Sequence, residues 1–483
     1  VTVERYIPAS RQAWRQLSVP TLGSQTIRQA WMEGDANVSP GQNNVAGYGT
    51  IISSGYANRV GNASQNPGGF DARSQTTSIR SFNGTAFVAQ ENVNRPVQDE
   101  AGFFLFIRGD RTKGVNSTGT NATTLRSRGT LITGEVTRTV NAGQFKLIGN
   151  PYASAIDFTQ ITRTGGVSNT LYLWDAALGA NGAYETFNSI DGYEATTGGG
   201  SWAESEVNTT IQSGQAFFVS AVGAGSVIMT EDSKVGGSNN KGLRPQAATP
   251  VSKLSTRLYA GGKAYDGAVV VFGSKYSNAV DKDDAVKLTN PGENLSIAQD
   301  GYNLAAEARA TLSSTTEEVI RYNLSNLKQQ QYTLEIKGVN LSGSAYLKDK
   351  YLGTTTVVDL SKSVQVHFEV TAEAGSSASD RFSLVLRPAA TAVPDSRVAG
   401  IKVSPNPIEG AAVTLQFIRQ DRGRYTVTLT DLAGRVLYNG VKEHAGGTAV
   451  QQVQLPSGIA KGAYHLSITG PDQSRQVQQV LVK

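Results

Sequence analysis

Three alternating rows near the end of the chain decide its fold: Val413-Thr-Leu415-Gln-Phe417, Tyr425-Thr-Val427-Thr-Leu429 and Tyr464-His-Leu466-Ser-Ile468. In each row every second residue is apolar and the residues between are polar. A period of two places one set of side chains in a core and leaves the other in water, as in a half-buried β-strand. The stretch from Gly400 to Lys483 divides into seven short strands, which predicts a small immunoglobulin-like sandwich.

The composition of the remaining chain predicts the same class of structure. Glycine is abundant, with 52 of 483 residues, and Tyr (18) and Phe (15) far outnumber Met (2). Such a mixture suits short strands joined by Gly, Asn and Ser turns. No helical periodicity extends beyond about two turns. We therefore expect an all-β protein of tandem β-sandwich domains that ends in a seven-stranded immunoglobulin-like domain.

Two stretches rich in Gly, Pro, Ala and Ser predict linkers, at Gly236–Ser252 and Ala389–Ser396. They divide the chain into a β-rich domain at 1–238, which could hold two sheet motifs, a β-sandwich at 251–388, and a C-terminal domain at 395–483. In the second of these, the apolar run Ala268–Phe272 is typical of a central strand.

A loose internal echo occurs three times in the first segment. Val97–Phe106, Val140–Leu147 and Ile211–Val219 each contain an apolar residue, a short turn ending in Gly, and a strand rich in aromatic residues. We interpret the glycine as the residue that supplies the turn dihedral and the aromatic residues as core. Three short echoes do not establish a repeat.

Several classes of site and partner are excluded by composition. The chain has no cysteine, which removes disulfides, thiolate metal sites and cysteine nucleophiles. Its net charge of +5 is spread among strand residues and forms no dense basic stripe, so we expect no nucleic-acid partner. No stretch approaches a membrane span, and no signal peptide is present. We expect a mature form or the C-terminal part of a longer protein that does not itself span the membrane.

No catalytic motif is visible in the sequence. The three histidines, His367, His444 and His465, are not accompanied by a G-x-S-x-G elbow, a Walker P-loop or an H-E-x-x-H motif. A glycosidase needs only two carboxylates at a suitable separation, which the sequence of a β protein cannot reveal. We therefore assign no catalytic residue and expect a protein that is not an enzyme.

Two sets of residues are candidates for binding. Asp281, Asp283 and Asp284 form either a solvated acidic turn or a structural Ca²⁺ site, because Ca²⁺ accepts hard oxygen ligands of this kind. Trp174 and Trp202 could form a sugar-binding platform, although core aromatic residues are the favoured interpretation. No cofactor is required by either set.

Three motifs follow one another within the last eighty residues. They are Ser404-Pro405-Asn406-Pro407, Asp431-Leu-Ala-Gly434-Arg435 and Lys461-Gly462-Ala-Tyr464. The prolines stiffen the start of the domain, Gly434 should take a positive φ in a hairpin, and Tyr464 should fill the core. Arg435 and Lys483 are expected at the surface.

This series of motifs resembles the type A C-terminal sorting domain of proteins exported by the type IX secretion system of Bacteroidetes-type bacteria. The resemblance implies that Pro405, Asn406, Pro407, Gly434, Arg435, Gly462, Tyr464 and Lys483 belong to a sorting signal. It also implies partners: an outer-membrane β-barrel shuttle and translocon, a sortase-like protease and surface lipopolysaccharide. The protein would cross the periplasm and reach the cell surface or the medium.

The upstream segments resemble phrases of adhesin-like Bacteroidetes surface proteins, for example Gly102–Asp110, Leu147–Asp157 and Tyr346–Gly353. A non-catalytic adhesin or stalk is the function that this resemblance implies. Two alternatives stay open: the accessory C-terminal region of a larger secreted enzyme, and a carbohydrate-binding module.

Overall fold

The computed structural model describes residues 1–34, 45–55, 67–236, 251–313, 315–341, 344–387, 400–408 and 410–483. The chain forms two compact units, Val1–Ala389 and Ala390–Lys483, called unit 1 and unit 2 below. The segments 1–238 and 251–388 both lie in unit 1, and the segment 395–483 lies in unit 2. Of the two expected linkers, residues 237–250 of the first and all of the second, 389–396, lie outside the described residues.

Strands dominate every part of the described chain, so the all-β prediction is confirmed. The first section of unit 1 is residues 1–236. Its described residues also form one short helix, α1 (Ile27–Trp31), which begins at a capping box between Thr26 and Gln29. They form three single-turn 3₁₀ helices as well, η1 (Phe158–Gln160), η2 (Ser189–Asp191) and η3 (Glu231–Ser233). The strands of this section are β1 (Thr2–Ile7), β2 (Ala13–Leu17), β3 (Thr21–Leu22), β4 (Ser53–Ser54), β5 (Ala72–Arg73), β6 (Ile79–Phe82), β7 (Phe87–Ala89), β8 (Phe103–Ile107), β9 (Thr123–Arg128), β10 (Thr130–Leu131), β11 (Val136–Val140), β12 (Gln144–Gly149), β13 (Ile156–Asp157), β14 (Thr162–Arg163), β15 (Thr170–Asp175), β16 (Ala183–Asn188), β17 (Thr210–Ile211), β18 (Ala216–Ala221) and β19 (Gly225–Met229).

The three echoes are turns of one kind that lead into three strands. Gly102, Gly143 and Gly214 have φ angles of +73°, +70° and +72°, and they lie just before β8, β12 and β18. A Cβ atom at Gly102 would also stand 2.2 Å from the carbonyl oxygen of Leu17. The expected role of these glycines is confirmed, because a left-handed backbone favours a residue without a side chain.

The second section of unit 1, residues 251–387, is built on one large curled sheet with the order β28-β27-β30-β25-β23-β24-β21-β20-β26-β29, and β22 adds to β24. The sheet surrounds a core of aliphatic and aromatic side chains. Its elements are β20 (Ser252–Ala260), β21 (Lys263–Phe272), β22 (Ala285–Val286), β23 (Asn294–Gln299), β24 (Tyr302–Arg309), β25 (Glu318–Ser325), β26 (Gln331–Val339), β27 (Ser344–Asp349), β28 (Thr354–Val358), β29 (Val364–Glu369), η4 (Ala374–Ser377) and β30 (Phe382–Arg387).

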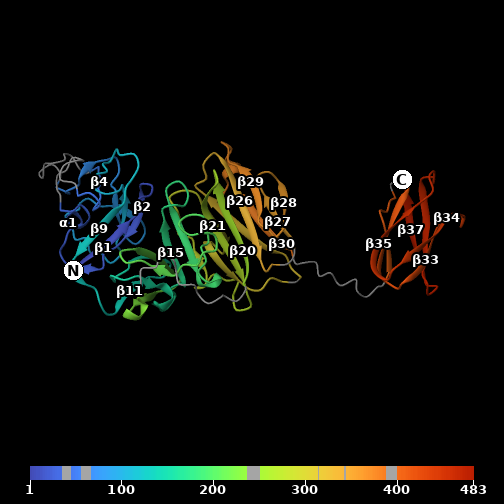
Figure 1. Cartoon of the computed structure of the whole chain (residues 1–483), viewed down its shortest axis with the longest axis horizontal. Helices are drawn as coiled ribbons and strands as arrows, with labels where there is room; N and C mark the ends of the chain where they lie inside the picture. Colours follow the sequence, from blue (N-terminus) through green and yellow to red (C-terminus); the bar gives the residue numbers. More distant parts are fainter. Residues whose placement is uncertain are drawn as a thin grey trace. The chain divides into compact units, whose positions relative to one another are not determined.

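The two sections of unit 1 share a hydrophobic core. Along β21, Ala268, Val270 and Phe272 face the core of the second section. Val269 and Val271 point the other way and pack with first-section side chains that include Phe104, Tyr172, Trp174 and Phe218. The Tyr172 hydroxyl also donates to the carbonyl oxygen of Val286 at 2.6 Å. Figure 1 shows β15 and β21 in neighbouring parts of this unit. The continuous apolar run of β21 thus reflects burial on both faces.

The described residues of unit 2 form a sandwich of seven strands, as the alternating rows predict. One sheet has the order β31-β32-β35 and the other has the order β34-β33-β36-β37. Figure 1 shows β33, β34, β35 and β37 of this unit. The strands are β31 (Gly400–Ser404), β32 (Ala412–Gln420), β33 (Gly423–Thr430), β34 (Val436–His444), β35 (Gly447–Gln454), β36 (Gly462–Thr469) and β37 (Arg475–Val482). The apolar members of the three rows all lie in the core between the sheets.

Candidate functional site

The Pro-Asn-Pro segment closes part of the outer edge of the last strand, β37. The amide nitrogen Nδ2 of Asn406 donates to the carbonyl oxygen of Gln479 at 3.0 Å, and Asn406 Oδ1 accepts from the backbone N–H of Leu481 at 2.9 Å. Ile408 then pairs with Val482 in a parallel bridge. Pro405 and Pro407 carry no N–H, so the chain leaves β31 here and turns toward β37.

The Asp431–Arg435 turn joins β33 to β34 and is held by one carboxylate. Asp431 Oδ1 accepts from the backbone N–H groups of Ala433 at 3.0 Å and Arg435 at 2.9 Å, while Oδ2 accepts from Arg435 Nε at 3.1 Å. The hydrogen bond from the Arg435 backbone is the largest cause that lowers the pKa of Asp431. Gly434 has a φ of +85°, so the expected left-handed turn residue is confirmed.

Gly462 and Tyr464 lie at the start of β36, opposite the end of β37. Gly462 pairs with Val482, and Tyr464 pairs with Val480. The Tyr464 ring is buried in the core, and its hydroxyl donates to the carbonyl oxygen of Ala460 at 2.7 Å. The expected core role of Tyr464 is confirmed.

The registers bring all three motifs to one end of unit 2. Thr430, just before the Asp431 turn, pairs with His465 in β36. Gly462 and Ile408 both pair with Val482, next to Lys483. We call this region the motif end; it consists of Pro405, Asn406, Pro407, Asp431–Arg435, Lys461, Gly462 and Lys483. The opposite end of the same sheet carries Arg424 and Glu443.

The motif end presents basic and apolar side chains to solvent. Arg435, Lys461, Lys483 and Leu432 are exposed, and so is Leu481, which lies beside the motif end in β37. The sequence places these residues far apart, and only the pairing register shows that they lie together.

The acidic turn at Asp281–Asp284 is tied to the backbone. The Asp284 carboxylate is buried and accepts from the backbone N–H groups of Asp281 at 2.7 Å and Ala308 at 2.9 Å. Asp281 Oδ1 accepts from the N–H of Asp283 at 2.8 Å. Burial raises the pKa of Asp284 to about 6. Among the described residues, no group of three or more His, Cys, Asp or Glu side chains is placed to hold a metal ion, so the structure does not assemble the Ca²⁺ ligand set considered from the sequence.

The two tryptophans considered for sugar binding do not form a platform. Trp174 is only 7% exposed, and its indole N–H donates to the carbonyl oxygen of Trp14 at 2.9 Å. Trp202 is half-buried and packs edge-on against Phe187 in a different hydrophobic cluster. Trp174 stabilises the shared core of unit 1, which is the interpretation that the sequence favoured.

Two buried carboxylates that the sequence did not reveal hold a glycine-rich loop. Glu185 accepts from the backbone N–H groups of Thr197 at 2.7 Å and Gly198 at 2.8 Å. Asp175 accepts from the backbone and the hydroxyl of Ser201, both at 2.6 Å. Burial raises the pKa of Glu185 to about 7. The sequence signal for Glu185 is weak: it is an acid between the aromatic residues Tyr184 and Phe187 of the strand Ala183–Asn188.

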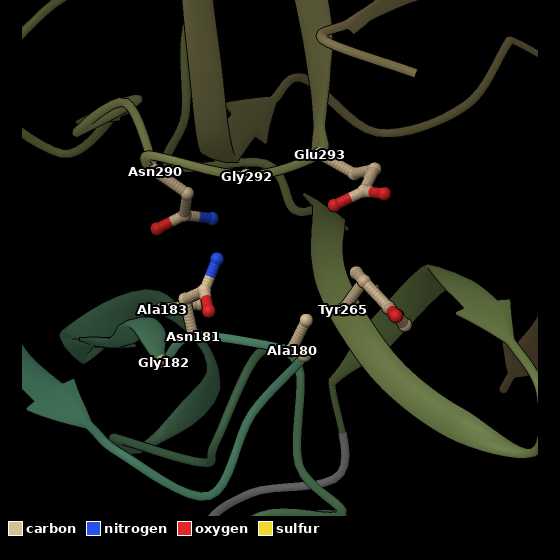
Figure 2. A pocket seen from close by; sticks show the side chains of 9 residues that line it. Ala180, Asn181, Gly182, Ala183, Tyr265, Asn290, Gly292 and Glu293 are labelled. Carbon is tan, nitrogen blue, oxygen red and sulfur yellow. The ribbon is translucent and has the colours of Figure 1, made fainter. Parts of the chain in front are cut away.

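A small cavity lies between the two sections of unit 1 (Figure 2). It is lined by the Gly179–Ala183 loop, Tyr265, Asn290, Gly292 and Glu293, and its volume is about 10 Å³. Asn290 Nδ2 has no hydrogen-bond partner among the described residues, whereas its Oδ1 accepts from the N–H of Tyr184. This volume holds about one water molecule, which is too little for a substrate.

A larger, polar depression lies beside α1 and the end of β9. Its volume is about 500 Å³, and it is lined by Ser24, Gln25, Gln29, Ala30, Glu33, Gly34, Arg126 and Arg128. Arg126 pairs with Glu33 and stands 4.0 Å from the centre of the Tyr48 ring. This volume falls within the usual range of small-molecule sites.

The chain belongs to a family whose model is described as a domain of unknown function (DUF8693), which matches residues 49–386. The match covers most of both sections of unit 1 and ends before unit 2. The chain has no match among curated proteins. No helix in the described chain combines the length and the apolar character that a membrane span needs.

Two similar solved structures come from Porphyromonas gingivalis. One is dimeric latent PorU, with 10% identity and a TM-score of 0.16, and the match covers 79% of this chain and 35% of PorU. The other is PorZ, described as an essential bacterial surface component of the type IX secretion system, with 13% identity and a TM-score of 0.14. That match covers 70% of this chain and 58% of PorZ. Our chain therefore spans between a third and three fifths of their lengths, and likeness at these scores carries no argument about function.

Proposed function

We propose that this member of the DUF8693 family is a secreted or cell-surface β protein exported by the type IX secretion system, with unit 2 as its sorting and anchoring domain. The observation that carries the proposal is the convergence of the Pro405–Pro407, Asp431–Arg435 and Lys461–Gly462 motifs with Lys483 at one end of unit 2. Separate motifs that form one exposed surface are what a recognition signal requires.

In this proposal the motif end is the surface that the outer-membrane shuttle and translocon bind after the protein has crossed the periplasm. Arg435 is suited to this contact because the Asp431 carboxylate already fixes its guanidinium, which lowers the entropy lost on binding. A sortase-like protease and surface lipopolysaccharide would act on the exported protein, either by anchoring it or by releasing it.

Unit 1 would then be the exported passenger, a non-catalytic surface module of the adhesin or stalk type. Its shared core supports this role. Val269 and Val271 of the second section pack against Phe104 and Trp174 of the first, so the two sections are joined by buried apolar contacts. Large buried apolar contacts hold neighbouring sections of a chain in a fixed arrangement.

Export of the full chain with paired substitutions at the two ends of unit 2 tests the proposal. Arg435→Ala and Arg424→Ala form a matched pair, because their side chains are 77% and 76% exposed and each arginine is paired with one acid. We expect Arg435→Ala to reduce surface display and leave more protein in the periplasm, and Arg424→Ala to behave as the parent. Deletion of residues 400–483 should retain unit 1 in the periplasm. Normal display of the deleted chain would overturn the proposal.

The polar depression beside α1 favours carbohydrate binding as a second candidate function. Gln29 and Arg128 are suited to hydrogen bonds with sugar hydroxyl or carboxylate groups, and both line the depression. A glycan array probed with the full chain tests this function. We expect Arg128→Ala to remove binding and Trp202→Ala to leave it unchanged, and an array without any bound glycan would exclude the function.

A further inference from the structure

The edge strand β28 (Thr354–Val358) exposes four of its five residues to solvent. It is the last strand on one side of the curled sheet and pairs only with β27 within the described part of unit 1. Its sequence is Thr354-Thr-Thr-Val-Val358, and only Val358 is buried. Because alternate residues face opposite sides of the sheet, exposure of Thr355, Thr356 and Val357 means that β28 extends beyond the core on both faces.

Two other edge strands carry features that discourage pairing, and β28 has neither of them. The strand β29 at the other end of the same sheet has His367 and Glu369 among its exposed residues. In unit 2, the edge of β37 is partly covered by Asn406 and Ile408. Charged residues and covered ends are the usual means by which proteins prevent strand addition. The five residues of β28 include no charge, no proline and no bulge.

We propose that β28 pairs antiparallel with β28 of a second copy of this chain, about a twofold axis at Thr356. In this register Thr354 faces Val358 of the other copy, Thr355 faces Val357, and Thr356 faces its own counterpart. Every cross-strand pair is therefore uncharged and β-branched, which suits strand pairing. The exposed backbone groups of both edges gain hydrogen bonds in the same step.

A second copy fits this edge because both partners would present the same uncharged, exposed strand. The register centred on Thr356 is the one that overlaps all five residues of both strands. The pairing would bury Val357, which is 67% exposed in the single chain. The contact is small compared with stable interfaces, so dimerisation should depend strongly on protein concentration.

Single-cysteine variants test the register, since the chain contains no cysteine. Thr356→Cys should form a disulfide-linked dimer under mild oxidation, because directly opposed residues have Cα atoms about 4.5–5.5 Å apart, within disulfide range. Thr354→Cys is the matched control. Its sulfur would lie about 13 Å from its counterpart, four residue steps away along the strand, and should not cross-link. Equal cross-linking of the two variants would overturn the proposal.

Sedimentation velocity of the full chain over a range of concentrations tests the pairing itself. We expect the parent chain to shift toward a dimer as concentration rises, and Thr355→Lys to remove that shift. Gln365→Lys, which adds the same charge to the exposed face of β29, should leave it unchanged. A parent chain that stays monomeric at every concentration overturns the proposal. That result would hold even if a strand of another protein were then found to bind the edge of β28.

Discussion

Unit 1 and unit 2 are both built from strands, but they bury different chemistry. Unit 1 encloses ion pairs such as Arg111 with Asp71 and Lys287 with Asp266. In the described part of unit 2, the buried polar residues are His444 and Ser467, and alternating apolar rows form the rest of the core. The fold of unit 2 therefore depends on hydrophobic pattern, whereas unit 1 also depends on specific buried partners. Because the two units have separate cores, calorimetry of the full chain should show two separate transitions.

Removal of one partner from a buried ion pair should cause the largest loss of stability, and the loss should occur in unit 1. Arg111 is fully buried and donates to both carboxylate oxygens of Asp71 at 3.0 and 2.8 Å. Arg111→Met removes both charge-assisted hydrogen bonds from Arg111 to the buried Asp71 carboxylate, so we expect unit 1 to lose about 3–5 kcal/mol. Chemical denaturation followed by tryptophan fluorescence measures the loss, because all four tryptophans lie in unit 1.

An exposed ion pair provides the control for this substitution. Arg424 and Glu443 in unit 2 are 2.9 Å apart and largely exposed. Arg424→Met should therefore change the stability of unit 2 by less than about 1 kcal/mol. If Arg111→Met were as mild as Arg424→Met, the distinction between the two units would be wrong.

Truncation of the unit 2 core should have a slightly smaller effect, confined to that unit. Leu466 is fully buried between the two sheets. Leu466→Ala removes its apolar contacts and leaves a cavity, which typically costs about 3 kcal/mol. We expect the calorimetric transition of unit 2 to move to lower temperature while that of unit 1 stays in place. A shift of both transitions would show that the units do not unfold independently.

The same difference explains which features of the two units could be predicted from the sequence. In unit 2 the rows containing Val427 and Leu466 predicted the strands, and Gly434 and Tyr464 had the expected roles. The period of two is a local pattern, so it can be recognised without knowing which strands pair. The convergence of Asn406, Gly462 and Lys483 could not be predicted, because it depends on the register between strands that are distant in sequence.

In unit 1 the junction between the sections was missed, although part of its signal was present. The run Ala268–Phe272 predicted a central strand, but not that Val269 and Val271 pack against the first section. A continuous apolar run indicates burial on both faces and does not identify the covering segment. Polar core residues such as Glu185 have no periodic signature, because their partners are backbone N–H groups of a loop.

The pH dependence of stability should also differ between the units. In unit 1, burial raises the pKa of Glu185 and of Asp191 to about 7. A carboxyl group with a raised pKa in the folded state favours folding below its unfolded pKa, and this contribution is lost as pH rises through the folded pKa. We therefore expect unit 1 to lose stability from about pH 4.5 to pH 7, by more than about 1 kcal/mol, since a tenfold change in a proton equilibrium equals about 1.4 kcal/mol.

Unit 2 and one variant of unit 1 are the controls for this pH dependence. The carboxylates with shifted pKa values in unit 2, Asp431 and Asp472, have values lowered by hydrogen bonds, so they act below this window. The transition temperature of unit 2 should stay nearly constant between pH 5 and 7. Asp191→Asn should flatten the slope of unit 1, and Glu317→Gln, at an exposed site, should not. Parallel slopes in both units would contradict this prediction.

Removal of divalent cations should have the smallest effect on the stability of unit 1. The Asp284 carboxylate is buried and accepts hydrogen bonds from the backbone N–H groups of Asp281 and Ala308, so its oxygens are already engaged. We expect a chelator, and then excess Ca²⁺, to leave the transition of unit 1 unchanged. Asp284→Ala should lower it through the two lost hydrogen bonds, by about 1–3 kcal/mol. A chelator that lowered the transition of the parent but not of Asp284→Ala would instead establish a Ca²⁺ site at this turn, because a bound ion stabilises only the chain that retains its ligands.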